Sequence, residues 1–379
     1  MAPRSEENRQ RDVLISSHKV DHHIPTEQID EKPFKTEIVW RNVAAFVFLH
    51  YCAFQVYHFF NRDLFIFHTI YGFIAGYGIV AGAHRLWSHR SFKANFPLQV
   101  FLMILQTISM ENDTIEWVRD HRVHHKYSDT NADPTNSNRG FFFSHMGWLM
   151  CKKHPDVKKF GAKIDMSDVE AEPVLQFQRK YYYQLVFIFS FFIPMAISMY
   201  FWQVTVWQAF CAVICRYVLS LHIVWCTNSI AHIGDWKPYD KTIAASDSLL
   251  NGTFTFGEGW HNFHHTFPWD YKVSEKPLYR HNFGMIFIDF FAWLGWATDL
   301  KVASEDLIRK RVLRTGDGSH PFAIEEAKKQ QLNEDYLNNN CGAEEECSEA
   351  PSEVFWGLGD TDLPKEEIEG IQTINKKFV

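Results

Sequence analysis

Long apolar blocks alternate with polar stretches along this chain of 379 residues. Four of the blocks are long enough to be membrane helices, and they cover residues 43–60, 64–83, 184–202 and 206–226. At about 1.5 Å of rise per residue, each block would extend for roughly 27–32 Å, close to the hydrocarbon thickness of about 30 Å. Few residues separate the first block from the second, or the third from the fourth. The pattern predicts an all-α integral membrane protein with four transmembrane helices in two hairpins.

The distribution of charge predicts the orientation of these hairpins. Each hairpin returns the chain to the side that it left, so residues 84–183 and everything after residue 226 lie on the same side as the N-terminus. Most Lys and Arg residues near the blocks lie in the middle stretch, whereas the short turns on the other side contain Arg62. Cytoplasmic loops carry the excess of Lys and Arg in membrane proteins. Both termini and a helical cap built by the middle and later stretches are therefore expected in the cytosol.

Two further apolar runs, residues 96–110 and 283–297, are too short to span a membrane. Amphipathic or apolar helices of this length are typical of segments that lie at the membrane surface. Residues 1–37 are polar without an apolar period, and residues 319–379 form an acidic tail rich in Glu, Asn and Gln. Such compositions favour disorder. The sequence thus predicts one folded domain, residues 38–318, between two tails with little fixed structure.

Charge and cysteine content exclude some classes of protein. The net charge is -7 and no dense run of Lys and Arg occurs, so nucleic acid is not an expected partner. The seven cysteines contain no CxxC pair, which argues against a disulfide scaffold or a zinc ribbon. The charged N-terminus lacks the apolar core of a signal peptide, so insertion into the membrane is expected to begin at an internal segment.

Nine of the twenty histidines fall into four places, all on the side assigned to the cytosol. They are His84 and His89 in HRLWSH, His121, His124 and His125 in HRVHH, His232, and His261, His264 and His265 in HNFHH. Residues at i, i+3 and i+4 share one face of a helix, so each HxxHH motif is expected to present all its imidazoles toward one point. The first pair is five residues apart, which is a turn of about 140° in an α-helix and suits a helix that emerges from the membrane.

These histidines have the chemistry of metal ligands. A lone histidine is more often a hydrogen-bonded core or surface residue, but three clusters that contain eight histidines reverse this expectation. Imidazole suits zinc, copper, iron and nickel, and eight or nine nitrogen ligands exceed the need of one four-coordinate ion. The zinc-protease motif HExxH is absent. We therefore expect the cap to hold a histidine-ligated site for two metal ions.

The segments GAHRLWSHRSFKA, EWVRDHRVHHKYSDTNADP, RGFFFSHMGWL, GEGWHNFHHTFPWDY and RTGDG resemble the membrane acyl-CoA desaturases of the stearoyl-CoA delta-9 type, most closely the insect branch. The resemblance implies an enzyme of the endoplasmic reticulum membrane that introduces a cis double bond into a long-chain acyl-CoA. It also implies two Fe2+ ions, O2 as the oxidant, and electrons from NADH through cytochrome b5 and its reductase. All nine histidines match metal ligands of the family, and Asn228 matches an asparagine that holds one metal through a water molecule.

The resemblance also marks residues for the substrate. The positions that match contacts to CoA and the start of the acyl chain are Asn42, Asn112, Arg119, Asp120, Lys152, Lys153 and Trp225, and Trp117 and Trp148 match the adjoining tunnel. Cations suit phosphates, although each residue alone could be a surface charge or a packing aromatic. Gly72 and Gly76 share a helix face and match the far end of the tunnel, which would favour chains of about eighteen carbons or more. Close packing of membrane helices is the alternative role of these glycines.

Two other functions stay open at this level. A membrane fatty-acid or sterol hydroxylase would use the same metal ligands and would return oxygen to the substrate. A metal transporter or scaffold would place its ligands near the middle of the membrane, whereas these histidines lie beyond the ends of the predicted spans. The motifs do not determine the position of the double bond, the chain length or the product, whether a common fatty acid, a pheromone or a cuticular lipid.

Overall fold

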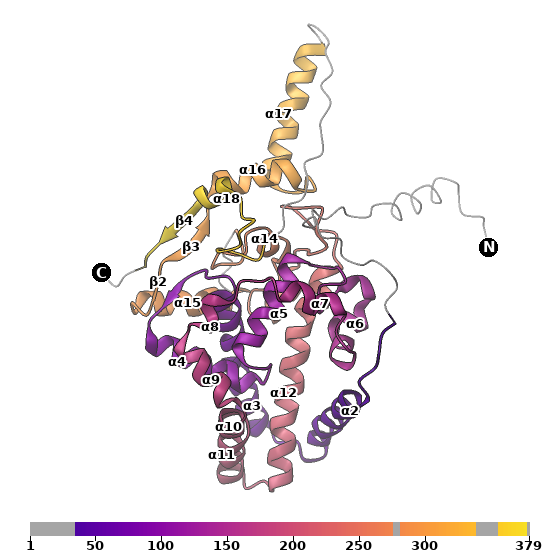
Figure 1. Ribbon diagram of the computed structural model, residues 1–379, viewed down its shortest axis with the longest axis vertical. Helices are drawn as coiled ribbons and strands as arrows, with labels where there is room; N and C mark the ends of the chain where they lie inside the picture. The colour runs from indigo at the N-terminus through magenta and orange to yellow at the C-terminus, as the bar shows by residue number, and fades with distance from the viewer. Residues whose placement is uncertain (1–34, 276–280, 339–354, 377–379) are drawn as a thin grey trace, which may run out of the picture.

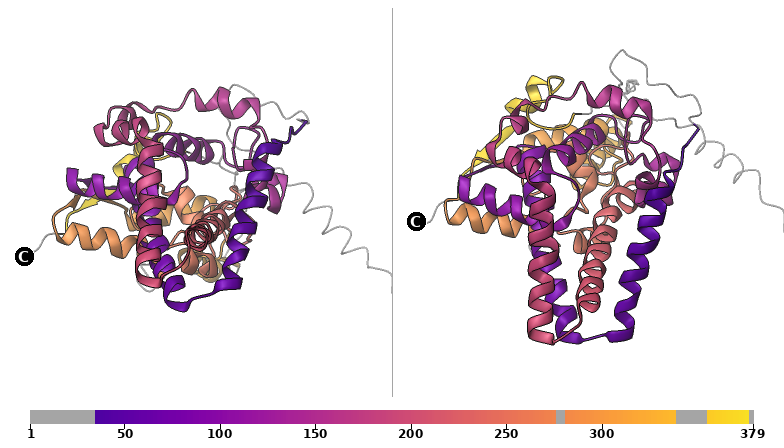
Figure 2. Two further views of the ribbon diagram at one scale, coloured as in Figure 1. Left: turned by 90° about the horizontal axis from the view of Figure 1, so that it is seen from below. Right: turned by 60° about the horizontal axis from the view of Figure 1, so that its bottom comes forward.

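The computed structural model describes residues 35–275, 281–338 and 355–376. These residues are mostly helical, and a group of long helices projects from one side of a broader cap of shorter helices and loops (Figure 1). Figure 2 shows the long helices from below and with their lower ends tilted forward, standing side by side. The apolar blocks of the sequence thus gather in the group of long helices, and the histidine motifs lie in the cap or directly next to it.

The projecting helices, here called the bundle, begin and end close to the predicted blocks. They are α2 (Trp40–Gln55), α3 (Arg62–Tyr77), α10 (Tyr182–Val186), α11 (Ile193–Trp202) and α12 (Val206–Ser229). Irregular segments continue them: the 3-10 turns η1 (Val56–Phe59) and η6 (Ile230–His232), and the π-helical segments η2 (Gly78–Ser88) and η5 (Phe187–Phe192). Helix α12 packs against α2, α3 and α11, which makes it the central element of the bundle.

Side-chain caps determine where two of the long helices begin. The Asn61 side chain accepts hydrogen bonds from the backbone N–H groups of Asp63 and Leu64 at the start of α3. Thr205 and Gln208 form a capping box at the start of α12. Such caps satisfy backbone donors that have no partner inside the helix. Each of the two turns of the bundle is therefore followed by a helix whose first residues are fixed by a cap.

Length and hydropathy identify three membrane-compatible helices among the described residues: Arg62–Ser88, Tyr182–Trp202 and Val206–His232. They correspond to the second, third and fourth predicted spans. The first predicted span differs, because α2 ends at Gln55 and the chain continues as the 3-10 turn η1. Four crossings of a membrane therefore stay a prediction, for which three helices have the required length and composition.

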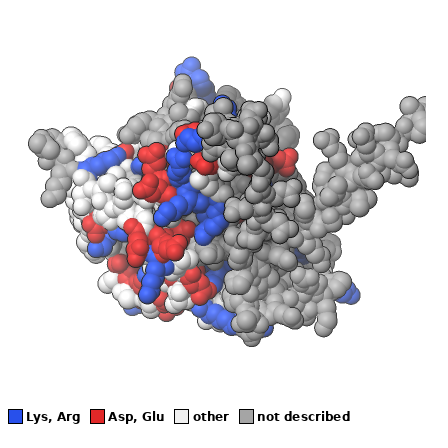
Figure 3. All heavy atoms as spheres, turned by 90° about the horizontal axis from the view of Figure 1, so that it is seen from above, with Lys and Arg blue, Asp and Glu red and all other residues white. Residues whose placement is uncertain are grey.

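The outer surface of the bundle is apolar. Large hydrophobic side chains are exposed along it, among them Phe48, Ile66, Phe187, Phe201 and Leu219. An apolar surface of this extent is typical of contact with lipid or with another protein. The outward face of the cap, by contrast, mixes Lys and Arg with Asp and Glu, as is typical of a surface in water (Figure 3).

The cap consists of short helices and four very short strands. Its helices are α4 (Phe96–Ser109), α5 (Thr114–Lys126), α6 (Phe141–His145), α7 (Pro155–Gly161), α8 (Ser167–Glu170), α9 (Pro173–Lys180), α13 (Leu249–Phe254), α14 (His261–Thr266), α15 (Phe283–Trp293), α16 (Glu305–Thr315), α17 (Pro321–Asn338) and α18 (Lys365–Glu369), with the 3-10 turns η3 (Ser137–Arg139) and η4 (Gly147–Met150). Strand β1 (Lys93–Ala94) pairs with β2 (Ala297–Thr298), and β3 (Leu300–Ala303) pairs with β4 (Ile371–Ile374). The two antiparallel pairs depart from the predicted all-α fold, although helices dominate.

The two short apolar runs form α4 and α15. Both helices pack against η2, at the level where the second bundle helix enters the cap. Their buried side chains, such as Leu102 and Ile288, join the main core of the cap together with Val118 of α5. The helical nature of both runs is confirmed, while their position at a membrane surface stays a prediction.

Arg216 lies in the middle of α12, where an ionisable group is costly in a membrane. Its guanidinium donates hydrogen bonds to the backbone carbonyl groups of Ser190 at 3.1 Å and Ile108 at 3.5 Å. The same group lies over the ring of Tyr71, 5.1 Å from its centroid. Backbone carbonyls and an aromatic face thus surround this cation inside the bundle.

The acidic C-terminal tail is more ordered than the sequence predicted. Residues 321–338 form α17, and residues 355–376 fold back onto the cap, where β4 pairs with β3. Phe355 and Trp356 are buried, with 1% and 2% of their surface exposed. The structure departs here from the expected lack of fixed structure. In residues 355–376 the acidic average of the tail concealed a short apolar sequence whose partners are distant in the chain, whereas α17 packs against the preceding helix α16. Most of the rest of both predicted tails lies outside the described residues.

The predicted orientation can be tested by labelling sealed microsomes with a membrane-impermeant maleimide. Glu116 is exposed on the cap and Arg62 is exposed in the turn between α2 and α3. We expect a Glu116→Cys variant to react above the background of the native chain in intact vesicles. An Arg62→Cys variant should react only after detergent opens the vesicles. Equal labelling of both variants before detergent would contradict the hairpin topology.

Candidate metal centre

The first histidine pair is positioned by the π-helical segment η2, whose hydrogen bonds span one residue more than those of an α-helix. The backbone N–H of His89 donates to the carbonyl of His84, five residues earlier, at 3.2 Å. Residues five apart then lie on the same side of the helix, and the two ring centroids are 4.8 Å apart. The turn of about 140° expected for an α-helix therefore does not apply. The wider helix is what allows both imidazoles to face the same point.

Helices α5 and α14 carry the two HxxHH motifs. Asp113 caps α5 by accepting a hydrogen bond from the N–H of Glu116 at 3.2 Å, and the three histidines of the motif occupy the last turns of the helix. The second motif spans most of α14, and His232 lies in η6 directly after α12. All of these imidazoles are buried except that of His121, which is half-buried. The spacing predicted that the rings of each motif would meet at one point, but they do not, because each motif divides its histidines between two groups: His124 joins a different group from His121 and His125.

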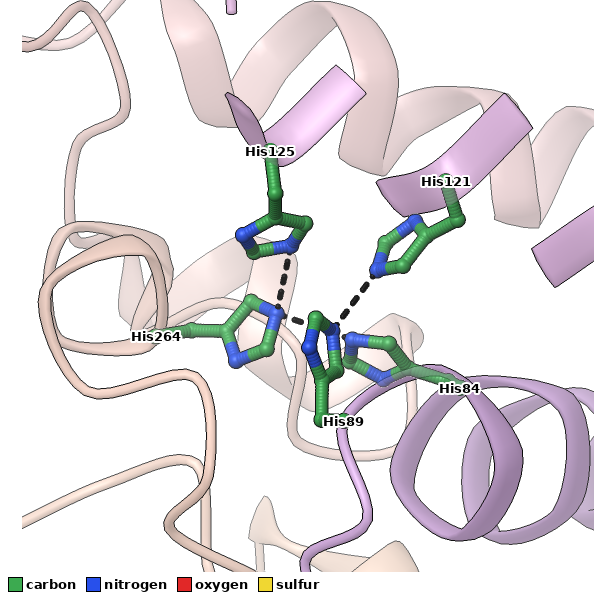
Figure 4. Close-up of side chains that lie close together, drawn as sticks. All are labelled: His84, His89, His121, His125 and His264. Atoms are coloured by element: carbon green, nitrogen blue, oxygen red, sulfur yellow. Dashed lines mark hydrogen bonds between the residues drawn. The ribbon is translucent and has the colours of Figure 1, made fainter. Parts of the chain in front are cut away.

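The structure brings the nine histidines together in two groups. The five-histidine cluster consists of His84, His89, His121, His125 and His264, and the four-histidine cluster consists of His124, His232, His261 and His265. Within each cluster, one ring nitrogen per residue lies within 4.8 Å of the others. Figure 4 shows the rings of the five-histidine cluster converging from η2, α5 and α14. The clusters adjoin, because the rings of His125 and His265 stack with centroids 4.1 Å apart.

The distances between nitrogens fit a pair of metal ions. Nε2 of His84 is 2.8 Å from Nε2 of His264, and Nε2 of His232 is 3.0 Å from Nε2 of His261. With a metal–imidazole bond of about 2.1 Å, as in zinc sites, two ligands at right angles would lie about 3.0 Å apart. Where neither of two facing nitrogens carries a proton, their lone pairs repel at this distance, and a cation between them removes the repulsion. Each cluster could therefore hold one metal ion through imidazole nitrogens.

Carboxylates orient several of these imidazoles through the other ring nitrogen. Nδ1 of His124 is 3.0 Å from Asp133, Nδ1 of His232 is 3.0 Å from Asp129, and Nδ1 of His84 is 3.2 Å from Glu258. An ionised carboxylate can only accept a hydrogen bond, so the proton of the neutral ring stays on Nδ1 and the unprotonated Nε2 is directed at the cluster. Outer partners of this kind are typical of histidines that bind metals.

Burial keeps most of the nine imidazoles neutral. It lowers the pKa of His89, His121, His125, His261, His264 and His265 well below the usual value, and neighbouring histidines lower it further. Burial also lowers the pKa of His124, but the nearby Asp133 outweighs this effect and raises it. For Glu258, burial raises the pKa, yet His84 and Arg85 bring it to about 2. Neutral imidazoles beside ionised carboxylates are the protonation states that metal binding requires.

Several functional residues were not singled out by sequence reasoning. Asp129, Asp133 and Glu258 orient histidines, and Arg85 donates to Glu258 at 2.7 Å. The carbonyl of Trp356 accepts from Nδ1 of His89 at 2.7 Å. The three carboxylates lie inside the quoted motifs, so their proximity to the histidines was a usable signal. Nothing in the local sequence around Trp356 indicated a link to His89.

A cavity of about 780 Å³ extends from both clusters along one face of α3. Its lining is mostly apolar and includes His84, His121 and His261 at one end and Leu64 and Phe65 at the other. The stretch of α3 and η2 from Leu64 to Val80 corresponds to about 24 Å of helix. Such a shape fits a long, narrow apolar ligand with one region next to the clusters.

The structure places several predicted site residues on the wall of this cavity. Asn228, Trp117, Gly72 and Gly76 all line it. The ring of Trp117 stacks on His121 with centroids 4.8 Å apart. A Cβ atom at Gly76 would lie 2.6 Å from the ring of Phe256, so close packing as well as the cavity requires a glycine there. At Gly72 a Cβ atom would lie 3.1 Å from the Arg216 side chain.

Glu111 is a further residue of the cavity wall that the sequence analysis did not identify. Trp117 Nε1 donates a hydrogen bond to Glu111 Oε2 at 3.2 Å. Burial raises the pKa of Glu111 to about 7, and this hydrogen bond opposes the shift. Burial therefore favours the neutral form of this carboxyl group more than water would, and Trp117 lies between it and His121.

The residues predicted to contact CoA lie outside the lining of the cavity. Asn42 donates to the carbonyl of Leu149, next to Trp148. The exposed ammonium groups of Lys152 and Lys153 pair with Glu37 and Asp120. The other three residues of the set lie at separate places. Arg119 lies 3.8 Å from Glu170, and Asn112 is exposed after α4. Trp225 is buried against Phe46 and His145.

A bundle of membrane-compatible helices under a cap with two adjoining histidine clusters defines a class of histidine-rich membrane metalloproteins. Comparison with known proteins narrows this class, because residues 63–282 match the fatty acid desaturase family. The chain belongs to the fatty acid desaturase family. It is 45% identical over 351 residues to an acyl-CoA Delta-9 desaturase of Acheta domesticus, which covers 91% of this chain and 89% of the relative.

Two further relatives show how far this similarity extends. An acyl-CoA Delta12-desaturase of Acheta domesticus is 45% identical over 352 residues, which is 92% of this chain and 89% of the relative. The Delta(9)-fatty-acid desaturase fat-6 of Caenorhabditis elegans is 49% identical over 295 residues, 76% of this chain and 87% of the relative. The two insect relatives differ in their named double-bond position at equal identity to this chain. Overall similarity therefore does not reveal which carbons are oxidised.

The outer carboxylates provide a test of metal binding that is separate from activity. In an Asp129→Asn variant the partner of His232 loses its charge, so we expect metal to bind the four-histidine cluster about 10- to 100-fold more weakly. Metal per chain, measured after dialysis against a graded chelator, checks this. The matched control is Asp156→Asn, which changes a carboxylate 3.5 Å from His154, outside both clusters. Equal metal retention by the two variants would show that Asp129 does not support metal binding.

Proposed function

We propose that this chain is an acyl-CoA desaturase that introduces a cis double bond into a long-chain fatty acyl-CoA. The main support is the position of two adjoining histidine clusters at one end of a long apolar cavity. In the proposed reaction two neighbouring methylene groups each lose one hydrogen. O2 accepts these hydrogens together with two electrons and two protons, and two water molecules form. The names of the relatives support the same reaction class.

The proposed cofactors are two iron ions, one in each histidine cluster, with Asn228 acting on one of them through water. Bound iron would activate O2 to remove hydrogen from an unactivated methylene, a reaction beyond the reach of a side-chain acid or base. Imidazole ligands are compatible with iron and also with zinc. The choice of iron rests on the family resemblance and on the oxidative chemistry.

The side chains of the cavity would select and orient the acyl chain. The apolar wall of the cavity would exclude water from the acyl chain. The ring of Trp117, which stacks on His121, would separate part of the acyl chain from that histidine. Holding the thioester end at a fixed place would decide which methylene groups lie beside the clusters. We propose that the predicted CoA residues provide this anchor, with Lys152 and Lys153 exchanging their carboxylate partners for phosphates.

The electrons have to come from outside the cavity, and we propose cytochrome b5 and its NADH-dependent reductase as their source. We also propose that the protein lies in the endoplasmic reticulum membrane with both termini in the cytosol. The mixed-charge face of the cap would then be accessible to soluble domains, and the apolar outer surface of the bundle would contact membrane lipid (Figure 3). Both assignments derive from the resemblance and the charge distribution.

Expression in a yeast strain that lacks its own desaturase tests the proposed function. Gas chromatography with mass spectrometry of the fatty acyl methyl esters should show new monounsaturated products. A hydroxylase would instead give hydroxylated acyl groups, which would contradict the proposal. A His264→Ala variant should lose desaturation completely while it still accumulates in the membrane, because a ligand of the five-histidine cluster is missing. His58→Ala changes an exposed histidine of the bundle and should retain activity.

The depth of the cavity predicts how chain length can be altered. Ser220 and Ala212 line the cavity on α12, about 18 and 30 Å of helix before His232. We expect Ser220→Phe to shift the products of a mixed acyl pool towards shorter chains. Ala212→Phe, nearer the far end, should affect only the longest chains.

Retained activity on short acyl groups shows that each of these variants is folded. Identical product lengths for both variants and the native chain would mean that the cavity does not hold the acyl group. These positions suit the test better than Gly76→Tyr, because the ring of Phe256 already occupies the space beside Gly76.

A further inference from the structure

Residues 355–376, here called the C-terminal segment, reach the metal centre from a distant part of the chain. The carbonyl oxygen of Trp356 lies 2.7 Å from Nδ1 of His89, which has no exposed surface. Nε2 of the same imidazole lies 2.9 Å from Nε2 of His121 within the five-histidine cluster. One side of the ring therefore contacts the C-terminal segment, and the other side faces the cluster.

This contact determines which nitrogen of His89 carries the proton. A backbone carbonyl can only accept a hydrogen bond, so Nδ1 must be the protonated nitrogen and Nε2 must present its lone pair. Carboxylates have the corresponding position at His84, His124 and His232. At His89 a backbone group of the C-terminal segment takes the place of the carboxylate.

Two glycines allow the segment to approach so closely. Gly357 has a φ of +141°, and a Cβ atom on it would lie 3.2 Å from Nδ1 of His89. Gly359 has a φ of +113°, and a Cβ atom on it would lie 2.4 Å from the guanidinium of Arg90. A side chain at either position would strain the backbone and push it away from the histidine. The sequence FWGLGD thus fits this contact in both conformation and space.

Charged side chains of α5 and its surroundings hold Trp356 in place. The guanidinium of Arg122 lies over the indole of Trp356, 4.2 Å from the ring centroid. Arg122 also donates to the backbone carbonyls of Trp87 and Ser88, directly before His89. The N–H of Trp356 donates to Asp360 at 2.9 Å, and Asp360 pairs with Lys126 at 2.7 Å. Because Lys126 follows His125 in α5, the same contacts join the segment to two of the histidine motifs.

The rest of the segment is anchored independently of the histidines. Strand β4 pairs with β3 over four residues, and Lys376 forms an ion pair with Asp289 of α15 at 2.7 Å. Phe355, at the other end, stacks on Trp269 with centroids 5.6 Å apart. The carbonyl of Trp356 is therefore held between two fixed points.

We propose that the C-terminal segment is a positioning element of the five-histidine cluster, and that the carbonyl of Trp356 fixes His89 in the orientation and tautomer needed to bind metal. This inference rests on the proposed function only in requiring that the cluster holds a metal ion. The fatty acid desaturase family model matches residues 63–282, so this segment lies beyond the part of the chain that the model covers. The metal centre of this chain is thus completed by residues outside that part.

The test compares how well four purified proteins retain metal after they have been loaded with Fe2+ in the absence of oxygen. They are the native chain, a chain that ends at residue 354, Asp360→Ala and Asp362→Ala. Asp362 is the matched control, because its carboxylate pairs with the same Lys126 at 2.8 Å and is largely exposed, whereas the N–H of Trp356 donates to Asp360. Iron per chain and the rate of iron removal by ferrozine are measured, and thermal unfolding of the metal-free proteins reports on the fold.

We expect the native chain and Asp362→Ala to retain two irons per chain. The shortened chain and Asp360→Ala should retain about one, or should release one iron about tenfold faster, because an outer partner of a ligand has been lost. Native release rates in both of these variants would overturn the proposal, as would equal losses in Asp360→Ala and Asp362→Ala. A native chain that binds no iron would contradict the proposed function instead.

If the shortened chain does not fold, Gly357→Ala replaces it. The added methyl group faces Nδ1 of His89 directly and leaves the anchors of the segment unchanged. We expect the same loss of about one iron per chain, and full retention of both irons would refute the role of the Trp356 carbonyl.

Discussion

The close packing of nine imidazoles in a space with little water is the constraint on which the rest of the cap depends. Their nitrogens face one another at 2.8–3.1 Å, a spacing that fits an N–H···N hydrogen bond or a cation between two unprotonated nitrogens. Burial favours the neutral rings, and outer carboxylates with the Trp356 carbonyl hold Nδ1 of several of them. Such a set is costly to bury without metal. The ion pairs of the cap, such as Arg85 with Glu258, make that arrangement possible.

The surfaces of the bundle and of the cap suit two different surroundings, lipid and water. The apolar outer surface of α3, α11 and α12 suits lipid, while the cap carries charges of both signs. The cavity along α3 leads from the apolar part to the clusters, so an apolar chain can reach the metals without entering water. The π-helical segment η2 lies at the junction, where the helix that lines the cavity also supplies the first histidine pair. A change of helix type thus connects substrate binding to the metal centre.

Similarity to known desaturases establishes the family of the chain but not its selectivity. Two relatives of equal identity to this chain are named for double bonds at different positions. The features that can differ lie along the cavity, where Glu111, Phe256 and Arg216 contribute polar or bulky groups next to small residues. In the proposed reaction the distance between the anchor and the clusters selects the carbon, so small changes in this wall would alter the product without changing a metal ligand.

The sequence by itself determined the periodic and local features of this protein. Hydropathy located three membrane-compatible helices, and the i, i+3, i+4 spacing assigned the histidines of α5 and α14 to single helix faces. The tertiary structure alone decided how the nine histidines divide into two clusters, since this depends on the crossing of η2, α5 and α14. It also decided the π-helical register that aligns His84 with His89, and it decided that residues 355–376 fold back onto the cap. Composition could not predict these features, because each depends on partners that lie far away in the chain and close together only in the folded protein.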